Sequence, residues 1–471
     1  MAPASDGHAR WVWLLAAIFA LAISYDLLRM PIQVSDSLGE MLDAQASPSV
    51  WQSFVGASGT HAYFRPLRIA QIKLLFDVAD GHYWLVYRGW HALLLCAAFA
   101  LFVRSLPVAS REECAAAAFA LVVFMGTHTF SGVVREAFPI NHFLEIVVAC
   151  LIALSLAQSR GHWAVDILGT VVFACAALTL ESGVLVWVVF LCARLLGLRG
   201  ASWRGIVLMT AVLAGYLVLR LYLLDVGTPG LSERSSGFGL EMLDPAELEE
   251  RFGRRPLLFY AYNVGTSVLS IFLGEPQNGA FVAVRDSMGG SVPARVVLGL
   301  LAAVPTTMLI AWAALHAWRQ RRAFSRTGQL LLVSLAVIAA NAVLSYAYSK
   351  NEILTPSGAF YAIAAFSAIV MVLERCRTSR TGFRAAILAM LVVSGTAWAV
   401  KSAGIHYLLS RQAARHRFDW AVLPVLSQPT GGARTDPKSL ALIESLRESA
   451  IHARVPGPRD HTQWMEDLWG D

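Results

Sequence analysis

Long apolar runs dominate this 471-residue chain and constrain its fold more than any other feature. A helix needs about 20 apolar residues to cross a bilayer core that is about 30 Å thick. Only 15% of the residues are charged and 56% are hydrophobic, whereas soluble domains carry about 25% charged residues. Since backbone groups in lipid must be paired within their own segment, such runs predict helices. We therefore expect an all-α polytopic membrane protein with about 11 transmembrane helices.

The spans can be placed along the chain, apart from one ambiguous segment at 257–273. That segment is apolar but contains Asn263 and Gly265. For the other spans to alternate, we expect it to lie at the interface or to re-enter the membrane, as non-spanning segments covered by protein can do. The predicted spans are 11–28, 84–103, 113–128, 143–158, 164–180, 183–198, 205–224, 296–318, 328–346, 358–374 and 385–403.

Clusters of arginine between the apolar runs predict the orientation. The segments 319–328 and 374–384 are the most basic, and Lys and Arg accumulate in cytoplasmic loops. This places the N-terminus in the cytoplasm and the long loops 29–83 and 225–295 outside. The chain then divides into a membrane domain, residues 1–403, and a small extracytoplasmic tail, residues 404–471. Within the tail, SLALIESLRESAI has the apolar spacing of an amphipathic helix.

Two other classes of protein are disfavoured by composition. The net charge is +6, but the cations lie between apolar runs, and no aromatic and basic module typical of nucleic-acid binding is present. We therefore expect no nucleic-acid partner. The six cysteines form no CxxC motif, which argues against a zinc site or a disulfide framework.

The first outer loop carries an acid directly after the first span. Asp36 opens the stretch SDSLGEMLDAQ, which could begin a helix with Ser35 or Asp36 as its cap. Alternatively, Asp36 is a carboxylate held at a helix end beside the membrane, where it would act as a general base or a metal ligand.

Two arginines follow in the same loop, in FRPLRIAQIKLLFDV. After Pro66 the pattern is amphipathic and predicts a helix lying on the membrane surface. Arg65 and Arg68 could simply extend to lipid headgroups. The sharper hypothesis is a phosphate site, because the planar guanidinium fork matches phosphate oxygens. The expected apolar face contains Ile69, Ile72, Leu75 and Phe76.

The second outer loop and the following turn contribute three more polar residues. Glu136 would be a second carboxylate on the outer face, or a local partner of Arg135, and His142 follows at the start of the next span. Glu181 lies among apolar residues between two spans that almost no loop separates. Because an ionisable group there is costly, we expect Glu181 to line a cavity.

The last outer loop, 346–363, carries Lys350 and Tyr348. Lys350 either pairs with Glu352 or reaches a ligand phosphate. Tyr348 belongs either to an interfacial aromatic belt or to a sugar-stacking surface.

Taken in order, these motifs resemble the GT-C superfamily of integral-membrane glycosyltransferases, which includes protein O-mannosyltransferases and the lipid A aminoarabinose transferase. The resemblance rests on the acid after the first span, the FRPL motif, the tight E-S-G turn and the polar last loop, over roughly residues 10–375. It implies two juxtamembrane helices, near 37–47 and 66–78, in a multi-pass protein of the bacterial inner (plasma) membrane. Many members carry two adjacent acids, whereas here Ser37 follows Asp36.

The resemblance also implies an activity. The donor would be a sugar carried on a polyprenyl phosphate, the acceptor a glycan, a lipid or a protein, and the reaction an inverting transfer with Asp36 as general base. Arg65, Arg68 and Lys350 would neutralise the donor phosphate. Glu136 would bind the sugar or, with Asp36, a divalent cation such as Mg or Mn.

Two alternatives compete with this hypothesis. A transporter or lipid flippase should hold its ionisable groups near the bilayer midplane, whereas the candidates here gather at one face. The residues Asp166, Arg220, Asn341 and Lys401, within or near spans, are explained by packing or by extension toward the interface. The single acid at position 36 would also suit a catalytically inactive scaffold.

Overall fold

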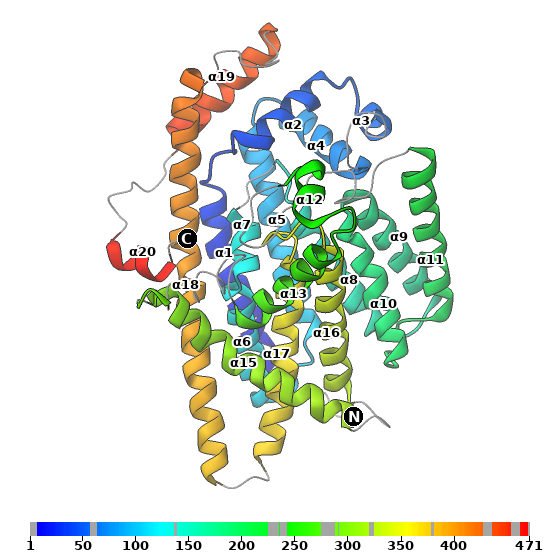
Figure 1. Ribbon diagram of the computed structural model, residues 1–471, viewed down its shortest axis with the longest axis vertical. Helices are drawn as coiled ribbons and strands as arrows, with labels where there is room; N and C mark the ends of the chain where they lie inside the picture. Colours follow the sequence, from blue (N-terminus) through cyan, green and yellow to red (C-terminus); the bar gives the residue numbers. More distant parts are fainter. Residues whose placement is uncertain are drawn as a thin grey trace.

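The computed structural model describes residues 7–56, 64–135, 139–224, 235, 243–274, 288–290, 292–319, 325–377, 381–426, 436–453 and 462–469 (Figure 1). For Ser35, Asp36 and residues 423–426 it describes only the backbone. The described residues form helices and no strand, apart from one isolated bridge between Ser235 and Leu243. The prediction of an all-α polytopic membrane fold is thereby confirmed.

The helices follow the predicted apolar runs closely. They are α1 (Gly7–Leu27), α2 (Ser35–Ala46), α3 (Val50–Gly56), α4 (Pro66–Ala79), α5 (Tyr83–Ser105), α6 (Arg111–Gly126), α7 (His128–Arg135), α8 (His142–Ala157), α9 (Trp163–Thr179), η1 (Glu181–Val184), α10 (Leu185–Leu195), α11 (Trp203–Val218), η2 (Leu219–Leu223), α12 (Pro245–Phe252), α13 (Leu257–Leu273), α15 (Ala294–Arg319), α16 (Arg326–Leu344), α17 (Thr355–Cys376), α18 (Thr381–Leu426), α19 (Pro437–His452) and α20 (Gln463–Trp469).

The number of spans differs from the sequence prediction. Among the described residues, 7 helices are long and apolar enough to cross a membrane, or up to 9 if each bent pair is one span. The helices α8, α9 and α10 occupy predicted spans but have only 16, 17 and 11 residues. The expected count of about 11 is therefore not confirmed. The ambiguous segment is α13, which meets α12 at 100°, as in a broken span or a re-entrant loop.

Helix α17 lies at the centre of the bundle and packs against α6, α15 and α16. Of its most apolar window, 94% is buried. Lipid or protein can cover an apolar helix, and the small and aromatic residues of α17 allow neighbouring helices to pack closely around it.

A neutral polar group of side chains joins α15, α17 and α18, and we call it the hydroxyl network. Thr306 Oγ1 lies 2.9 Å from Ser394 Oγ and accepts from Trp398 Nε1 at 3.0 Å. Ser394 donates to the Ala302 carbonyl at 2.7 Å, and Tyr361 OH lies 2.9 Å from Thr307 Oγ1. These buried groups satisfy one another, as polar groups in a core must.

The two ends of the bundle differ. At one end, which we call the basic end, Arg377 contacts Glu112 at 2.9 Å and Arg326 contacts Gln158 at 2.9 Å. The helices α2, α3 and α4 lie at the opposite end (Figure 1). The predicted outer loop 29–83 is thus separated from the basic loops by the length of the spans.

Within that loop, α2 and α4 form where juxtamembrane helices were expected, and α3 is an additional short helix. The cap interpretation of Ser35 and Asp36 is wrong, because Val34 occupies the cap position and α2 begins at Ser35. The apolar face of α4 also behaves differently from expectation. Ile72, Leu75 and Phe76 join a protein core cluster with residues of α2 and α5 instead of facing lipid. The cause is that α4 packs against α2, α3 and α5.

Helix α18 continues without a break across residue 404, where the tail was expected to begin. Its 46 residues extend about 69 Å, more than twice the thickness of a bilayer core. The amphipathic helix expected in the tail is α19, and it buries Leu442, Leu446 and Ala450.

Candidate functional site

A tight turn places Glu181 between two helices. Helix α9 ends at Thr179, and the 3-10 turn η1 begins at Glu181. A Cβ on Gly183 would lie 2.2 Å from the backbone carbon of Ala176. Because only glycine permits this approach, the E-S-G sequence itself holds Glu181 at the end of α9.

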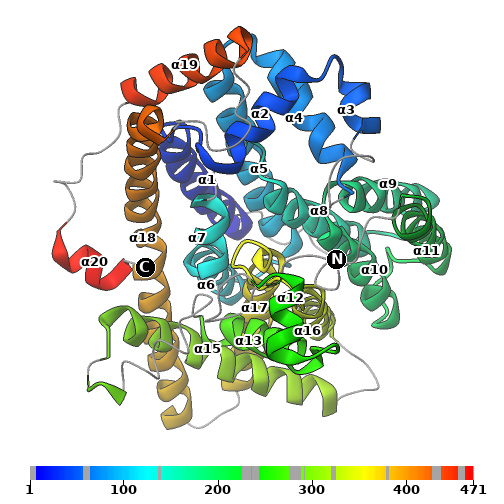
Figure 2. The same ribbon diagram turned by 45° about the horizontal axis from the view of Figure 1, so that its top comes forward.

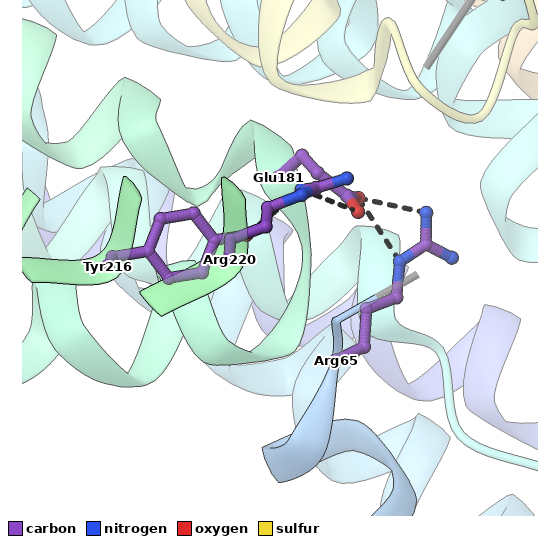
Figure 3. Close-up of polar contacts among 4 residues, drawn as sticks. All are labelled: Arg65, Glu181, Tyr216 and Arg220. Carbon is purple, nitrogen blue, oxygen red and sulfur yellow. Dashed lines mark hydrogen bonds and ion pairs between the residues drawn. The ribbon is translucent and has the colours of Figure 1, made fainter. Parts of the chain in front are cut away.

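Two arginines from distant segments converge on Glu181 (Figure 3). Arg65, just before α4, donates to Glu181 Oε2 from Nε at 3.1 Å and from Nη2 at 2.8 Å. Arg220 donates from Nη1 to Glu181 Oε1 at 3.1 Å, and to the Tyr216 hydroxyl at 3.1 Å. The exposed fractions of the Arg65, Glu181 and Arg220 side chains are 18%, 26% and 6%.

Arg220 lies in η2, a π-helical turn at the end of α11. Such turns shift the register of the side chains that follow and often occur at functional sites. The arginine is buried, although it follows a long apolar helix. Its contacts with Glu181 and Tyr216 explain why this charge is tolerated there.

The charge state of Glu181 follows from these contacts. Burial by itself raises the pKa of this carboxyl. The neighbouring guanidinium groups of Arg65 and Arg220 more than offset burial, and the pKa is held below its usual value. Glu181 is therefore ionised, and it neutralises part of the charge of the two arginines.

Arg68 extends the group from the next turn of α4. Its guanidinium contacts the carboxylate of Glu40, on α2. Burial lowers the pKa of Arg68, and the charges of Arg65 and Glu181 also act on it. An arginine remains protonated even so. We call Arg65, Arg68 and Arg220, with Glu40 and Glu181, the guanidinium cluster.

His142 and Glu145, in the first turn of α8, border this cluster. His142 is 2% exposed, and both Arg65 and Arg68 act on it electrostatically. Glu145 Oε1 accepts from Trp90 Nε1 at 3.1 Å, and the charge of Arg68 acts on this carboxyl too. The structure thus brings together four of the predicted residues: Arg65, Arg68, His142 and Glu181.

Two buried guanidinium nitrogens in the cluster find no hydrogen-bond acceptor in the described part of the chain. Among the described residues, Arg220 Nη2 and Arg68 Nε are buried without a hydrogen-bond acceptor. A buried charged donor left unpaired is costly. Such donors are matched when an anion with several oxygens binds.

The other predicted site residues are not shown in contact with the guanidinium cluster. Asp36 lies in the first turn of α2, one turn before Glu40, and its side chain is outside the described residues. Glu136 also lies outside them. Lys350 lies over the ring of Tyr348, 4.8 Å from its centroid, in the connection between α16 and α17. Their roles stay predictions.

Sequence reasoning missed four members of the site: Tyr216, Arg220, Glu40 and Glu145. A usable signal existed for Arg220, because an arginine in the apolar stretch YLVLRLYLL needs a partner. Glu181, the acid between two predicted spans, was an available partner for Arg220. No local sequence pattern indicated that the turn at Glu181 and the turn at Arg220 meet.

The predicted ligands of a divalent cation, Asp36 and Glu136, have no described side chains, so that site stays a prediction. The described residues contain no group of three His, Cys, Asp or Glu side chains that could hold a metal ion. Glu40 and Glu181, the carboxylates of the cluster, are both engaged by arginines.

Comparison with known proteins adds no family to this description. Neither a protein-family model nor a curated protein matches the chain.

Proposed function

We propose that this protein is an inverting glycosyltransferase that takes its sugar from a polyprenyl-phosphate donor. The observation that carries the proposal is the guanidinium cluster. Three arginines from two distant segments lie beside the carboxylates of Glu40 and Glu181, and two buried guanidinium nitrogens lack an acceptor among the described residues. These unmatched cationic donors suit a phosphate group.

In this proposal the cluster binds the donor phosphate and stabilises it as the leaving group. The bond between the anomeric carbon and the bridging phosphate oxygen breaks, and its electron pair stays on the phosphate. Arg68 and Arg220 stabilise the negative charge that develops. Lys350, at the start of the last outer loop, would approach the same phosphate.

The acceptor is activated from the other side of the donor sugar. Its hydroxyl oxygen forms the new bond to the anomeric carbon, and its proton passes to the Asp36 carboxylate. The backbone position of Asp36, one turn before the Arg68 partner Glu40, supports this assignment. Glu136 would bind the sugar.

The separation between the basic end and the guanidinium cluster supports an orientation of the protein in the membrane. With the basic end in the cytoplasm, the guanidinium cluster lies toward the extracytoplasmic leaflet of a bacterial inner membrane. A lipid-linked donor reaches a site at that depth laterally, without leaving the bilayer.

Binding of polyprenyl phosphate, measured by native mass spectrometry on detergent-solubilised protein, tests the anion site. We expect Arg220→Ala to weaken binding on the order of 100-fold, since charged hydrogen bonds contribute about 1.5–3 kcal/mol. The matched control is Arg377→Ala at the basic end, where an exposed arginine pairs with Glu112. It should bind like the wild type.

Transfer from radiolabelled polyprenyl-phosphate sugars tests the chemistry. We expect Asp36→Asn to abolish transfer while polyprenyl-phosphate binding persists. Full transfer by this variant would refute the base assignment. Unchanged binding by Arg220→Ala would refute the phosphate site.

A further inference from the structure

The connection between α1 and α2 is held by side-chain donors. Trp84 Nε1 and Arg88 Nε, on α5, donate to the Met30 carbonyl at 3.1 and 2.8 Å. Arg88 also donates to the Pro31 carbonyl, and Trp420 Nε1 donates to the Ile32 carbonyl at 2.7 Å. Three successive carbonyls outside any helix therefore receive buried partners, as backbone acceptors in a core require.

Trp420 reaches this connection from the far end of the chain. It belongs to α18, beyond the part of that helix needed to cross a bilayer, and is 0% exposed. Its partner Ile32 precedes Asp36 by four residues. The extension of α18 thus contacts the backbone immediately before the helix that carries the proposed base.

Helix α19, from the same C-terminal segment, packs against α2 itself (Figure 2). Gln45, in the last turn of α2, donates to the Lys438 carbonyl at 3.2 Å. Leu442 and Leu446 are buried in one cluster with Met41 of α2 and with Trp420. Helix α2 therefore packs against both α4 and α19.

We infer that residues 404–426 of α18 together with α19 form a brace that fixes α2, and that Trp420 is a positioning residue for Asp36. This inference rests on the proposed function for the role of Asp36. The brace explains why α18 continues well past the thickness of a bilayer. A displacement of about 1 Å at a reacting group can cost on the order of 100-fold in rate, so anchoring the backbone before Asp36 has a direct catalytic consequence.

Two buried tryptophans of α18 provide a matched test. Trp420 and Trp398 are both 0% exposed, and each donates one indole hydrogen bond. Trp398 donates to Thr306 in the hydroxyl network, away from α2. Each is replaced by phenylalanine, which keeps an aromatic ring and removes the N–H.

We expect Trp420→Phe to lower kcat about 10-fold without changing the donor KM, and to raise amide hydrogen exchange in residues 33–40 about 10-fold. Trp398→Phe should change neither quantity. Equal exchange in residues 33–40 for Trp420→Phe and the wild type would overturn the brace. If the wild type transfers no sugar, the proposed function fails, and the exchange comparison still decides whether the brace holds α2.

A cross-link keeps the inference testable if Trp420→Phe does not fold. The double variant Gln45→Cys/Lys438→Cys places thiols where α2 meets α19. We expect a short bifunctional reagent to join them, as mapped by mass spectrometry, with turnover retained. Failure to cross-link, or loss of turnover on cross-linking, would overturn the brace.

Discussion

The guanidinium cluster and the hydroxyl network are both buried polar groups of side chains, but they are built on opposite principles. In the hydroxyl network, Thr306, Ser394 and Trp398 are neutral and give one another hydrogen bonds. In the guanidinium cluster the groups are charged, and Arg68 and Arg220 keep buried nitrogens without acceptors among the described residues. Saturated neutral networks hold helices together, whereas an unsaturated charged one is suited to a ligand.

The largest effect is expected from a variant that changes the charge balance of the guanidinium cluster. Glu181→Gln keeps the shape of the side chain but removes the negative charge that faces Arg65 and Arg220. We expect a loss of about 2–3 kcal/mol in stability, because breaking a partly buried ion pair leaves the charge of Arg220 uncompensated. Thermal unfolding in detergent, followed by tryptophan fluorescence, measures this loss.

The same variant sharpens the comparison when ligand is added. Polyprenyl phosphate should raise the Tm of Glu181→Gln more than that of the wild type, since the anion replaces the missing charge. Equal shifts for the two proteins would mean that the phosphate binds elsewhere.

A smaller effect is expected in the hydroxyl network. Thr306→Val removes the acceptor of Trp398 Nε1 and a partner of Ser394, and we expect a loss of about 1–2 kcal/mol in stability. Polyprenyl-phosphate binding, measured by native mass spectrometry, should not change. If Thr306→Val bound polyprenyl phosphate more weakly at the same protein concentration, the hydroxyl network and the guanidinium cluster would be coupled. The contrast between a structural network and a ligand site would then fail.

The smallest expected effect is a pH dependence confined to the cluster. Because the pKa of Glu181 is held below its ordinary value of 4.5, its contribution to stability is fully present above that pH. It is lost as the pH falls through the lower pKa of the folded state. The stability difference between the wild type and Glu181→Gln should therefore be constant from about pH 5 to 8 and shrink by at most about 1.4 kcal/mol per pH unit below pH 4.5.

An unchanged difference down to pH 3 would show that the pKa of Glu181 is the same in the folded and the unfolded state. A difference that grows as the pH falls from 7 to 5 would instead show that the pKa of Glu181 is raised in the folded state.

The positions of the helices were predictable because they depend on local composition. The apolar run 257–273 coincides with α13, and the helix after Pro66 is α4. Proline fixes a helix start and apolar length fixes a span, and both are properties of neighbouring residues. The tight turn at Glu181 was likewise visible, since only glycine at 183 permits it.

The packing faces were less predictable. The apolar stripe on α4 was expected to meet lipid, but it meets α2 and α5. Amphipathic spacing gives the direction of an apolar face within a helix, but both lipid and a protein core can cover such a face.

The sequence by itself determined an all-helical membrane fold, the places of most of its apolar helices, and Arg65, Arg68, His142 and Glu181 as candidates. Only the tertiary structure decided that Arg220 completes the guanidinium cluster and that Trp420 holds the backbone before α2. Arg220 and Glu181 are 39 residues apart, and Trp420 and Ile32 are 388 apart. Contacts between such distant segments depend on how helices pack in three dimensions, and no local pattern of apolar and polar residues encodes that packing.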